Sequence, residues 1–201
     1  MYSAFDGVTV YVPPSETVNE KLPSSQMALT LLYDCGCSER VVVHSKAVST
    51  MAVKFAKACQ NKGLTVDVKL VEVGALLQDI GRSKTHDVTH AIVGVEIARS
   101  LNLPDSIVSI IERHIGGGIS SDEAKKLGLP VMDYFPVTLE EKLVAYADKL
   151  IESSNVVPIE RTIEQFSRKL GADHPAIDRV IKLHEELFPL IGDFNADNYS
   201  T

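Results

Sequence analysis

The sequence predicts an all-α protein, and three patterns indicate this fold class. Apolar residues recur at the spacing of an α-helix in successive segments from residue 24 onward. Glycine, asparagine and proline residues separate these segments, and serine or threonine stands where several of them begin. The 201 residues are enough for one domain with a substantial core and too few for two domains of ordinary size.

Two helices are expected near the start of this region. Ser24 or Ser25 can cap a short helix that reaches Tyr33. Ser38 can cap a long helix that ends at the Asn-Lys-Gly sequence of residues 61–63. Apolar residues and one histidine recur in the long helix at helical spacing: Val41, His44, Val48, Met51, Ala52 and Phe55.

Three more helices follow in the middle of the chain. One is expected over residues 67–79, and a loop over residues 81–85 connects it to another over residues 86–101. The third stops at the triple glycine of residues 116–118. Its apolar positions and a histidine recur at helical spacing: Ile107, Ile110, Ile111 and His114.

The last helices are expected after residue 137. Thr138 and Glu141 have the spacing of a capping box and would open a helix that reaches about residue 151. Two further helices are expected over residues 159–170 and 174–187.

The chain divides into three parts. Residues 1–23 form a short, irregular N-terminal extension, and residues 24–152 are expected to form the core of the domain. Residues 153–201 add C-terminal helices and a polar tail, which we expect to pack on the same domain. Three valines of the extension alternate with other residues as in an edge strand, before two prolines end the pattern: Val8, Val10 and Val12.

The composition is that of an ordinary globular protein, with 45% apolar and 23% charged residues. The net charge of −7 and the pI near 5.4 argue against a sequence-independent nucleic-acid binder, which needs a basic face. They still allow a small phosphorylated ligand in a local basic pocket. We find neither an apolar run of roughly 20 residues, as a membrane span requires, nor a secretory signal, so we expect a cytoplasmic protein. The three cysteines, Cys35, Cys37 and Cys59, are interpreted as reduced thiols, with no second cysteine pair to form a zinc site.

Two carboxylates stand where helices do not favour them. Asp79 closes an apolar helix, where the helix dipole is negative, and Asp148 lies inside the apolar helix "LVAYADKLI". A buried carboxylate without a partner costs several kcal/mol or changes its pKa, so both residues should meet a cation. Lys149 is adjacent to Asp148, but we expect it to point to a different face of the helix.

Three histidines fall at the ends or in the apolar stripes of the expected helices: His44, His90 and His114. On its own, His44 is more simply interpreted as a histidine of the core. Together with the two carboxylates, the three histidines are better explained by a bound metal. Imidazole and carboxylate donors suit divalent zinc, manganese, iron, cobalt or nickel.

The order of these residues resembles a known family. His44, "ALLQDIG", His90, "ERHIGGGI" and "YADKL" together resemble the HD-domain superfamily of metal-dependent phosphohydrolases, and within it the HDIG-type branch and a group of uncharacterised archaeal HD proteins. The resemblance covers roughly residues 24–152 and implies the HD-domain helical bundle. It also implies that one metal is bound by a first histidine, a His-Asp dyad and a late aspartate, which here are His44, Gln78, Asp79 and Asp148. Members with two metals add two histidines, matched by His90 and His114, and Asp79 would then bridge the ions.

Gln78 departs from the family pattern, which has histidine at this position of the dyad. An amide oxygen can bind a hard ion but is a weaker donor to zinc or iron than imidazole. We therefore expect one or two divalent ions, with lower affinity at the first position or a preference there for Mn²⁺ or Mg²⁺; iron, zinc, nickel and cobalt are the other candidates. The adjacent pair His86-Asp87 follows a polar loop and is not expected to be the dyad. His86 is expected either to line the site or to lie on the surface.

The resemblance implies hydrolysis of a small phosphate ester by metal-activated water. Asp79, Arg82 and Lys84 are the expected catalytic residues, although a solvated loop is the alternative for Arg82 and Lys84. The expected substrate contacts are Arg82, Lys84, His86 and Gly117, whose backbone amide lies in the triple glycine and could approach an anion. Lys125 and Lys126 are interpreted as solvated charges. A nucleotide is the preferred substrate class, because the longer signature of the cyclic-dinucleotide phosphodiesterases is reduced here to "RHIGGGIS".

Two other functions are compatible with this pattern. One is a di-iron oxygenase of the HD fold, although Gln78 would weaken one iron position. The other is a nucleotide-binding sensor that has lost catalysis, which Gln78 favours. We expect a small phosphorylated partner, no membrane and no nucleic acid, and a homo-oligomer is compatible with the sequence.

Overall fold

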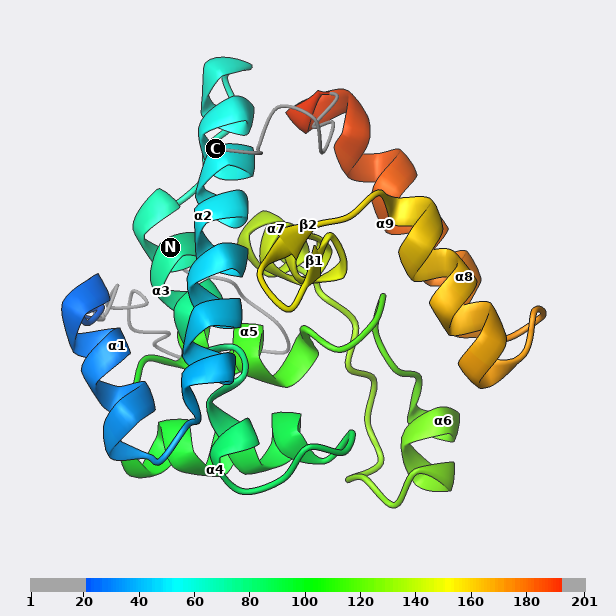
Figure 1. The fold of residues 1–201 in the computed structure, drawn as a ribbon. Helices are drawn as coiled ribbons and strands as arrows, with labels where there is room; N and C mark the ends of the chain where they lie inside the picture. The colour runs from blue at the N-terminus through cyan, green and yellow to red at the C-terminus, as the bar shows by residue number, and fades with distance from the viewer. Residues whose placement is uncertain (1–20, 193–201) are drawn as a thin grey trace, which may run out of the picture.

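The computed structural model describes residues 21–192, and within this range the protein is almost entirely helical (Figure 1). The possible strand around Val8 and the polar tail lie outside the described residues. The helices, a 3₁₀ helix η1 and a two-stranded hairpin follow one another along the chain: α1 (Ser25–Asp34), α2 (Glu39–Asn61), α3 (Val68–Leu77), η1 (Ile80–Ser83), α4 (His90–Ser100), α5 (Asp105–Arg113), α6 (Ser121–Lys126), α7 (Leu139–Lys149), β1 (Ile151–Glu152), β2 (Asn155–Val156), α8 (Ile159–Leu170) and α9 (Pro175–Ile191).

The long helix α2 lies between α1 on one side and the α8–α9 pair on the other (Figure 1). It packs against α3, α7 and α9, and Phe55 is fully buried at the centre of this contact. A second apolar cluster joins α1 and the first half of α2 to α3, α4 and α5. None of the described helices is long and apolar enough to cross a lipid bilayer.

Local hydrogen bonds explain where several helices begin. The Ser24 hydroxyl accepts a hydrogen bond from the amide of Met27, and Ser38 stands at the start of α2 without such a bond. The capping box expected at the start of α7 is only half formed. Thr138 accepts from the amide of Glu141, but the Glu141 carboxylate accepts from the amide of residue 137 and pairs with Arg113.

Other boundaries differ from those expected. The helix expected over residues 67–79 ends at Leu77, where the chain tightens into η1. The helix expected from residue 86 begins at His90, because the carboxylate of Asp87 accepts a hydrogen bond from the amide of Thr89 and forms a turn. Helix α6 and the hairpin were not expected.

Candidate metal centre

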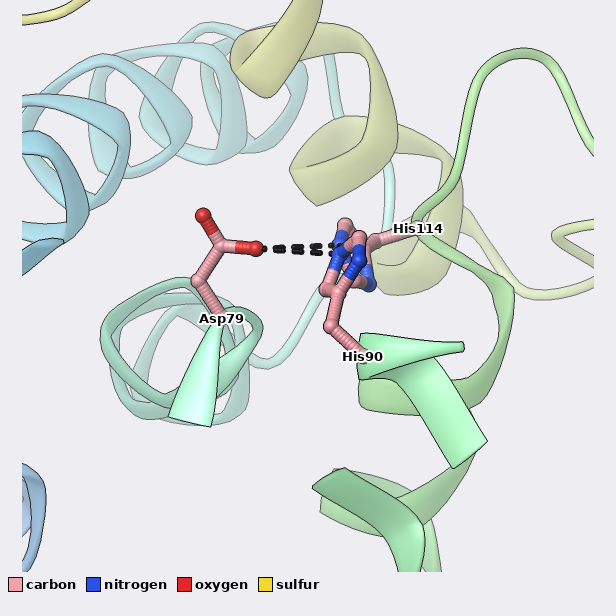
Figure 2. Close-up of side chains that lie close together, drawn as sticks. All are labelled: Asp79, His90 and His114. Atoms are coloured by element: carbon pink, nitrogen blue, oxygen red, sulfur yellow. Dashed lines mark hydrogen bonds and ion pairs between the residues drawn. The ribbon is translucent and has the colours of Figure 1, made fainter. Parts of the chain in front are cut away.

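Three buried side chains from separate segments of the chain meet at one point (Figure 2). Asp79 lies between α3 and η1, His90 is the first residue of α4, and His114 follows the last residue of α5. Oδ1 of Asp79 lies 3.2 Å from Nε2 of His90 and 3.4 Å from Nε2 of His114, and the two Nε2 atoms are 3.1 Å apart. At most 4% of each residue is exposed, so the point between them is shielded from bulk water.

Main-chain carbonyl groups determine which nitrogen of each imidazole carries the proton. Nδ1 of His90 lies 2.6 Å from the carbonyl oxygen of Asp87, and Nδ1 of His114 lies 2.7 Å from that of Ile111. A carbonyl oxygen only accepts, so Nδ1 is the donor in both rings and Nε2 of a neutral ring carries a lone pair. Burial lowers the pKa of His90 by more than the nearby Asp79 raises it, so the neutral ring is favoured. When both rings are neutral, two lone pairs and a carboxylate oxygen face one another, an arrangement that a cation stabilises.

The spacing of these donor atoms fits a divalent metal ion. Bonds of about 2.1 Å at octahedral or tetrahedral angles place neighbouring donor atoms roughly 3.0–3.4 Å apart. The three distances in the group are 3.1, 3.2 and 3.4 Å. Both the donor types and their separations are therefore those that such an ion requires.

A second group of polar side chains lies against the other oxygen of Asp79. Nε2 of His44, from α2, is 3.8 Å from Oδ2 of Asp79 and 3.0 Å from Oδ1 of Asp148, near the end of α7. The amide nitrogen of Gln78 donates a hydrogen bond to the same Asp148 oxygen at 3.1 Å. Asp79 thus directs one oxygen toward the two histidines of the first group and the other toward His44, as a bridging carboxylate does. The structure brings all six residues expected at the metal into one cluster.

Two buried oxygen atoms of the cluster accept no hydrogen bond within the described part of the chain: Oε1 of Gln78 and Oδ1 of Asp79. Gln78 is completely buried. Nε of Arg82 lies 2.7 Å from Oδ1 of Asp79, which makes an ion pair without the geometry of a hydrogen bond. An unsatisfied buried oxygen costs roughly 1–3 kcal/mol. A bound cation would offset this cost at Oδ1 of Asp79, which also faces Nε2 of His90 and Nε2 of His114, and this supports the fit of the donor set.

The electrostatic environment keeps the carboxylates ionised. Burial raises the pKa of Asp79, but the contacts with His114 and His90 outweigh it and hold the pKa well below its usual range. Burial also raises the pKa of Asp148, and the nearby Lys149 and His44 lower it by more. The site therefore keeps its negative charge at neutral pH, as a cation-binding site must.

Lys149 is the close cationic partner of Asp148. Its Nζ lies 2.5 Å from Oδ2 of Asp148, so the expectation that it points to a different face is wrong. Lys149 is the last residue of α7, and its long side chain turns back onto the preceding residue. His44 responds to the same carboxylate: burial lowers its pKa, but the hydrogen bond and charge of Asp148 raise it by more.

A cavity of about 510 Å³ opens beside this cluster. Its lining includes His44 and Asp79 together with three basic residues: Arg40, Arg82 and His86. His86 is both exposed and part of the lining, so the two placements expected for it coexist. Arg40 was missed in the sequence, although it precedes His44 by four residues and therefore shares its helix face.

Two of the expected substrate contacts lie elsewhere. Lys84 is exposed, donates a hydrogen bond to the carbonyl oxygen of Cys35 and is not among the residues that line the cavity. Gly117 is buried against α9, where a Cβ atom would lie 2.7 Å from the carbonyl carbon of Arg179. Glycine is required there because a loop and a helix approach each other closely, and the structure does not bring this residue to the cluster.

These features define a helical domain with a buried histidine and aspartate centre. The chain belongs to the HD domain family, whose model matches residues 41–152. An uncharacterized protein of Methanocaldococcus jannaschii is 49% identical over 83% of this chain and 98% of its own length. The tRNA (cytidine(56)-2'-O)-methyltransferase of Thermoplasma volcanium is 42% identical over 85% of this chain, which spans only 48% of that protein. Ribonuclease Y of Aquifex aeolicus is 34% identical over 42% of this chain and 14% of its own length.

Among solved structures, the chain is similar to the HD domain of the L. monocytogenes phosphodiesterase PgpH. The TM-score is 0.47 at 19% identity, over 84% of this chain and 89% of that one. The same domain in complex with cyclic-di-AMP gives a TM-score of 0.48 at 17% identity, over 84% of this chain and 99% of that one.

Proposed function

We propose that this protein is a metal-dependent phosphohydrolase that acts on a small phosphate ester of the nucleotide class. The observation that supports it best is the convergence of two imidazole nitrogens and a buried carboxylate oxygen at metal-ligand spacing, next to a cavity with basic residues. Membership of the HD domain family is consistent with this activity.

The two groups of side chains would hold divalent ions on either side of Asp79. His90 and His114 would serve one position, and His44, Asp148 and the oxygen of Gln78 the other. A divalent ion bound here supplies charge neutralisation at phosphoryl oxygens and lowers the pKa of a bound water. Gln78 contributes a neutral and weaker donor than imidazole, so the position beside His44 is expected to be the weaker of the two.

The basic residues of the cavity would bind and orient the phosphate. The guanidinium of Arg82 already lies against Asp79, at 2.7 Å, and therefore stands next to the place where an ester oxygen would be held. Arg40 lines the same cavity, and the two planar guanidinium groups can each donate two hydrogen bonds to a phosphate. The volume of about 510 Å³ is within the usual range of roughly 300–1,000 Å³ for small-molecule sites.

A small anion fits the charge of the molecule better than a polymer does. The net charge of −7 opposes a long polyanion, whereas the positive groups of the cavity are local. The names of two relatives, a tRNA methyltransferase and ribonuclease Y, favour an RNA phosphate as the second candidate substrate. A panel containing nucleotides, dinucleotides and short RNA oligomers distinguishes the two, because an RNA enzyme would act on the oligomers in preference to free nucleotides.

Gln78 favours one alternative function, a nucleotide-binding sensor without catalysis. Its amide donates to Asp148 in the position where the family pattern has a histidine, so the first metal position lacks one imidazole. Single-turnover assays with excess Mn²⁺ separate the two functions. Binding of a nucleotide without release of phosphate over days would make the protein a sensor. An iron content with oxygen-dependent turnover would instead indicate the di-iron oxygenase.

The proposal is tested by the substitution Asp79→Asn, with Asp173→Asn as the matched control. Asp173 is exposed in the connection between α8 and α9, so this variant makes the same chemical change away from the cluster. We expect Asp79→Asn to lose Mn²⁺ binding, measured by calorimetry and elemental analysis, and to lose phosphate release, whereas the control keeps both. Full metal occupancy in Asp79→Asn would overturn the ligand assignment.

A further inference from the structure

A second cavity, of about 380 Å³, lies between the loop after α5, helix α6 and the α8–α9 pair. We call it the α8 cavity. It shares no lining residue with the cavity beside the metal centre. Most of its wall is apolar, with these side chains among the lining: Val88, Ile115, Leu127, Phe166 and Leu170.

The apolar wall is partly exposed to water. Leu127, at the end of α6, and Leu170, the last residue of α8, are each 47% exposed although both line the cavity. Covering such surface with an apolar group is worth about 25 cal/mol per Å². An apolar body that entered the cavity would therefore gain binding energy from side chains that the chain itself leaves partly uncovered.

The charged residues of the α8 cavity are mainly cationic. Lys126, Lys149 and Arg179 line it, whereas Glu123 is the one carboxylate among its lining residues. Arg179 is neutralised by Glu123, at 2.8 Å, and Lys149 by Asp148. Within residues 21–192, Lys126 makes no ion pair. An anionic group in this cavity would thus meet one cation that has no carboxylate partner in the described structure.

The walls of the cavity are held in place before any ligand arrives. Nε of Arg179 donates a hydrogen bond to the carbonyl oxygen of Gly118 at 3.0 Å, and its guanidinium lies 5.8 Å from the centre of the Phe135 ring. The close packing of Gly117 on the backbone of α9 fixes the same loop. The loop and α9 are therefore tied together, as expected for a largely preformed pocket.

We infer that the α8 cavity is a binding site for a small amphiphilic anion. The aromatic or alkyl body of the ligand occupies the apolar space against Phe166 and Leu170, and its anionic group pairs with Lys126. A volume of about 380 Å³ lies at the lower end of the usual range for small-molecule sites, roughly 300–1,000 Å³, which limits the ligand to a compact body. This site needs none of the six residues of the metal centre for its own lining, and it meets that centre only where Lys149 pairs with Asp148.

The inference is tested with anilinonaphthalene sulfonate, an aromatic anion whose fluorescence rises in apolar sites, on the full chain without added metal. We expect one saturable site per chain by fluorescence and calorimetry. Lys126→Glu should weaken binding roughly three- to tenfold, as expected for reversing one partly exposed charge. The adjacent Lys125→Glu, which changes the same charge on the same helix outside the cavity, should leave binding unchanged.

A second pair of variants tests the apolar wall. Leu170→Gln should weaken probe binding, and Leu101→Gln should not, because Leu101 is a similarly exposed leucine at the end of α4. Circular dichroism would show that all variants remain folded. Equal effects within either pair, or several weak sites instead of one, would overturn the inference. Loss of probe binding in Asp79→Asn would also overturn it, because the probe would then occupy the metal-site cavity.

Discussion

Gly81 allows η1 and α4 to approach so closely that a single added methyl group would force the two elements apart. A Cβ atom at this position would lie 1.9 Å from the carbonyl oxygen of His90 and 2.6 Å from the amide nitrogen of Gly94. Non-bonded contacts between heavy atoms are ordinarily about 3.5 Å or longer, so Gly81→Ala requires a displacement of roughly 1.5 Å. Both obstructing atoms belong to the backbone, so no side-chain rotation can relieve the clash.

That displacement would act directly on the metal centre. Gly81 follows Asp79 by two residues, and the obstructing atom belongs to His90, so the change moves one candidate ligand away from the other. Metal–ligand distances tolerate changes of only about 0.2 Å, far less than the displacement. We therefore expect Gly81→Ala to lower Mn²⁺ affinity at least tenfold. Overpacking of this kind also destabilises a fold by about 1–3 kcal/mol, which lowers the melting temperature by roughly 2–12 °C in a chain of this size.

Isothermal titration with Mn²⁺, at a temperature where the variant is folded, measures the first effect, and thermal unfolding without metal measures the second. Gly74→Ala is the matched control, since its Cβ atom would meet Cδ1 of Ile110 at 2.4 Å, the end of a side chain that can rotate. This control should lose some stability and keep its metal affinity. If Gly81→Ala bound Mn²⁺ as tightly as the unmodified protein, the contact between η1 and α4 would not determine the ligand geometry.

Three other substitutions test separate parts of the structure. Gln78→His restores an imidazole at the dyad and should raise metal affinity about 10–100-fold; unchanged metal content by elemental analysis would argue against Gln78 as a ligand. Arg40→Ala should weaken the binding of inorganic phosphate by about tenfold at unchanged metal content, whereas the exposed Arg99→Ala should not, and calorimetry compares them. Burial raises the pKa of Glu123, but Arg179 together with the amide and hydroxyl of Ser120 outweighs it and lowers the pKa to about 2, below the ordinary value of 4.5. The ionised Glu123 therefore contributes stability through these contacts above pH 4.5, and this stability is lost as the pH falls toward 2. Glu123→Gln should flatten that part of the curve of unfolding free energy against pH, and an unchanged curve would contradict the assignment.

The helices could be predicted because their apolar stripes are long and regular. The stripe that contains Val48 and Phe55 has the period of a helix for several turns, and both residues are fully buried in the structure. Helix α6 escaped prediction because its sequence is short and polar, and only Ala124 is buried in it. The hairpin after α7 was missed for a related reason: two-residue strands are too short to show an alternating pattern.

Some features of the candidate site could likewise be predicted from the sequence, and others could not. The proximity of the six residues expected at the metal could be predicted because their order along the chain resembles a family pattern, and their role as ligands stays a prediction. The positions of Lys149 and Gly117 depend on tertiary contacts instead. One is a side chain that folds back on its neighbour, and the other is a backbone pressed against a distant helix. Spacing in the sequence contains neither kind of information.

The imidazole rings of the centre are all oriented by main-chain oxygens. Nδ1 of His44 contacts the carbonyl oxygen of Ser153, just as the other two rings contact those of Asp87 and Ile111. Mutations that exchange the side chains at these three supporting positions would leave the rings aligned as long as the local backbone path persisted. Asp87 and Ile111 have other tasks as well, because Asp87 forms the turn before α4 and Ile111 is fully buried, but a search that compares only residue types would find no trace of the support that their carbonyl groups provide.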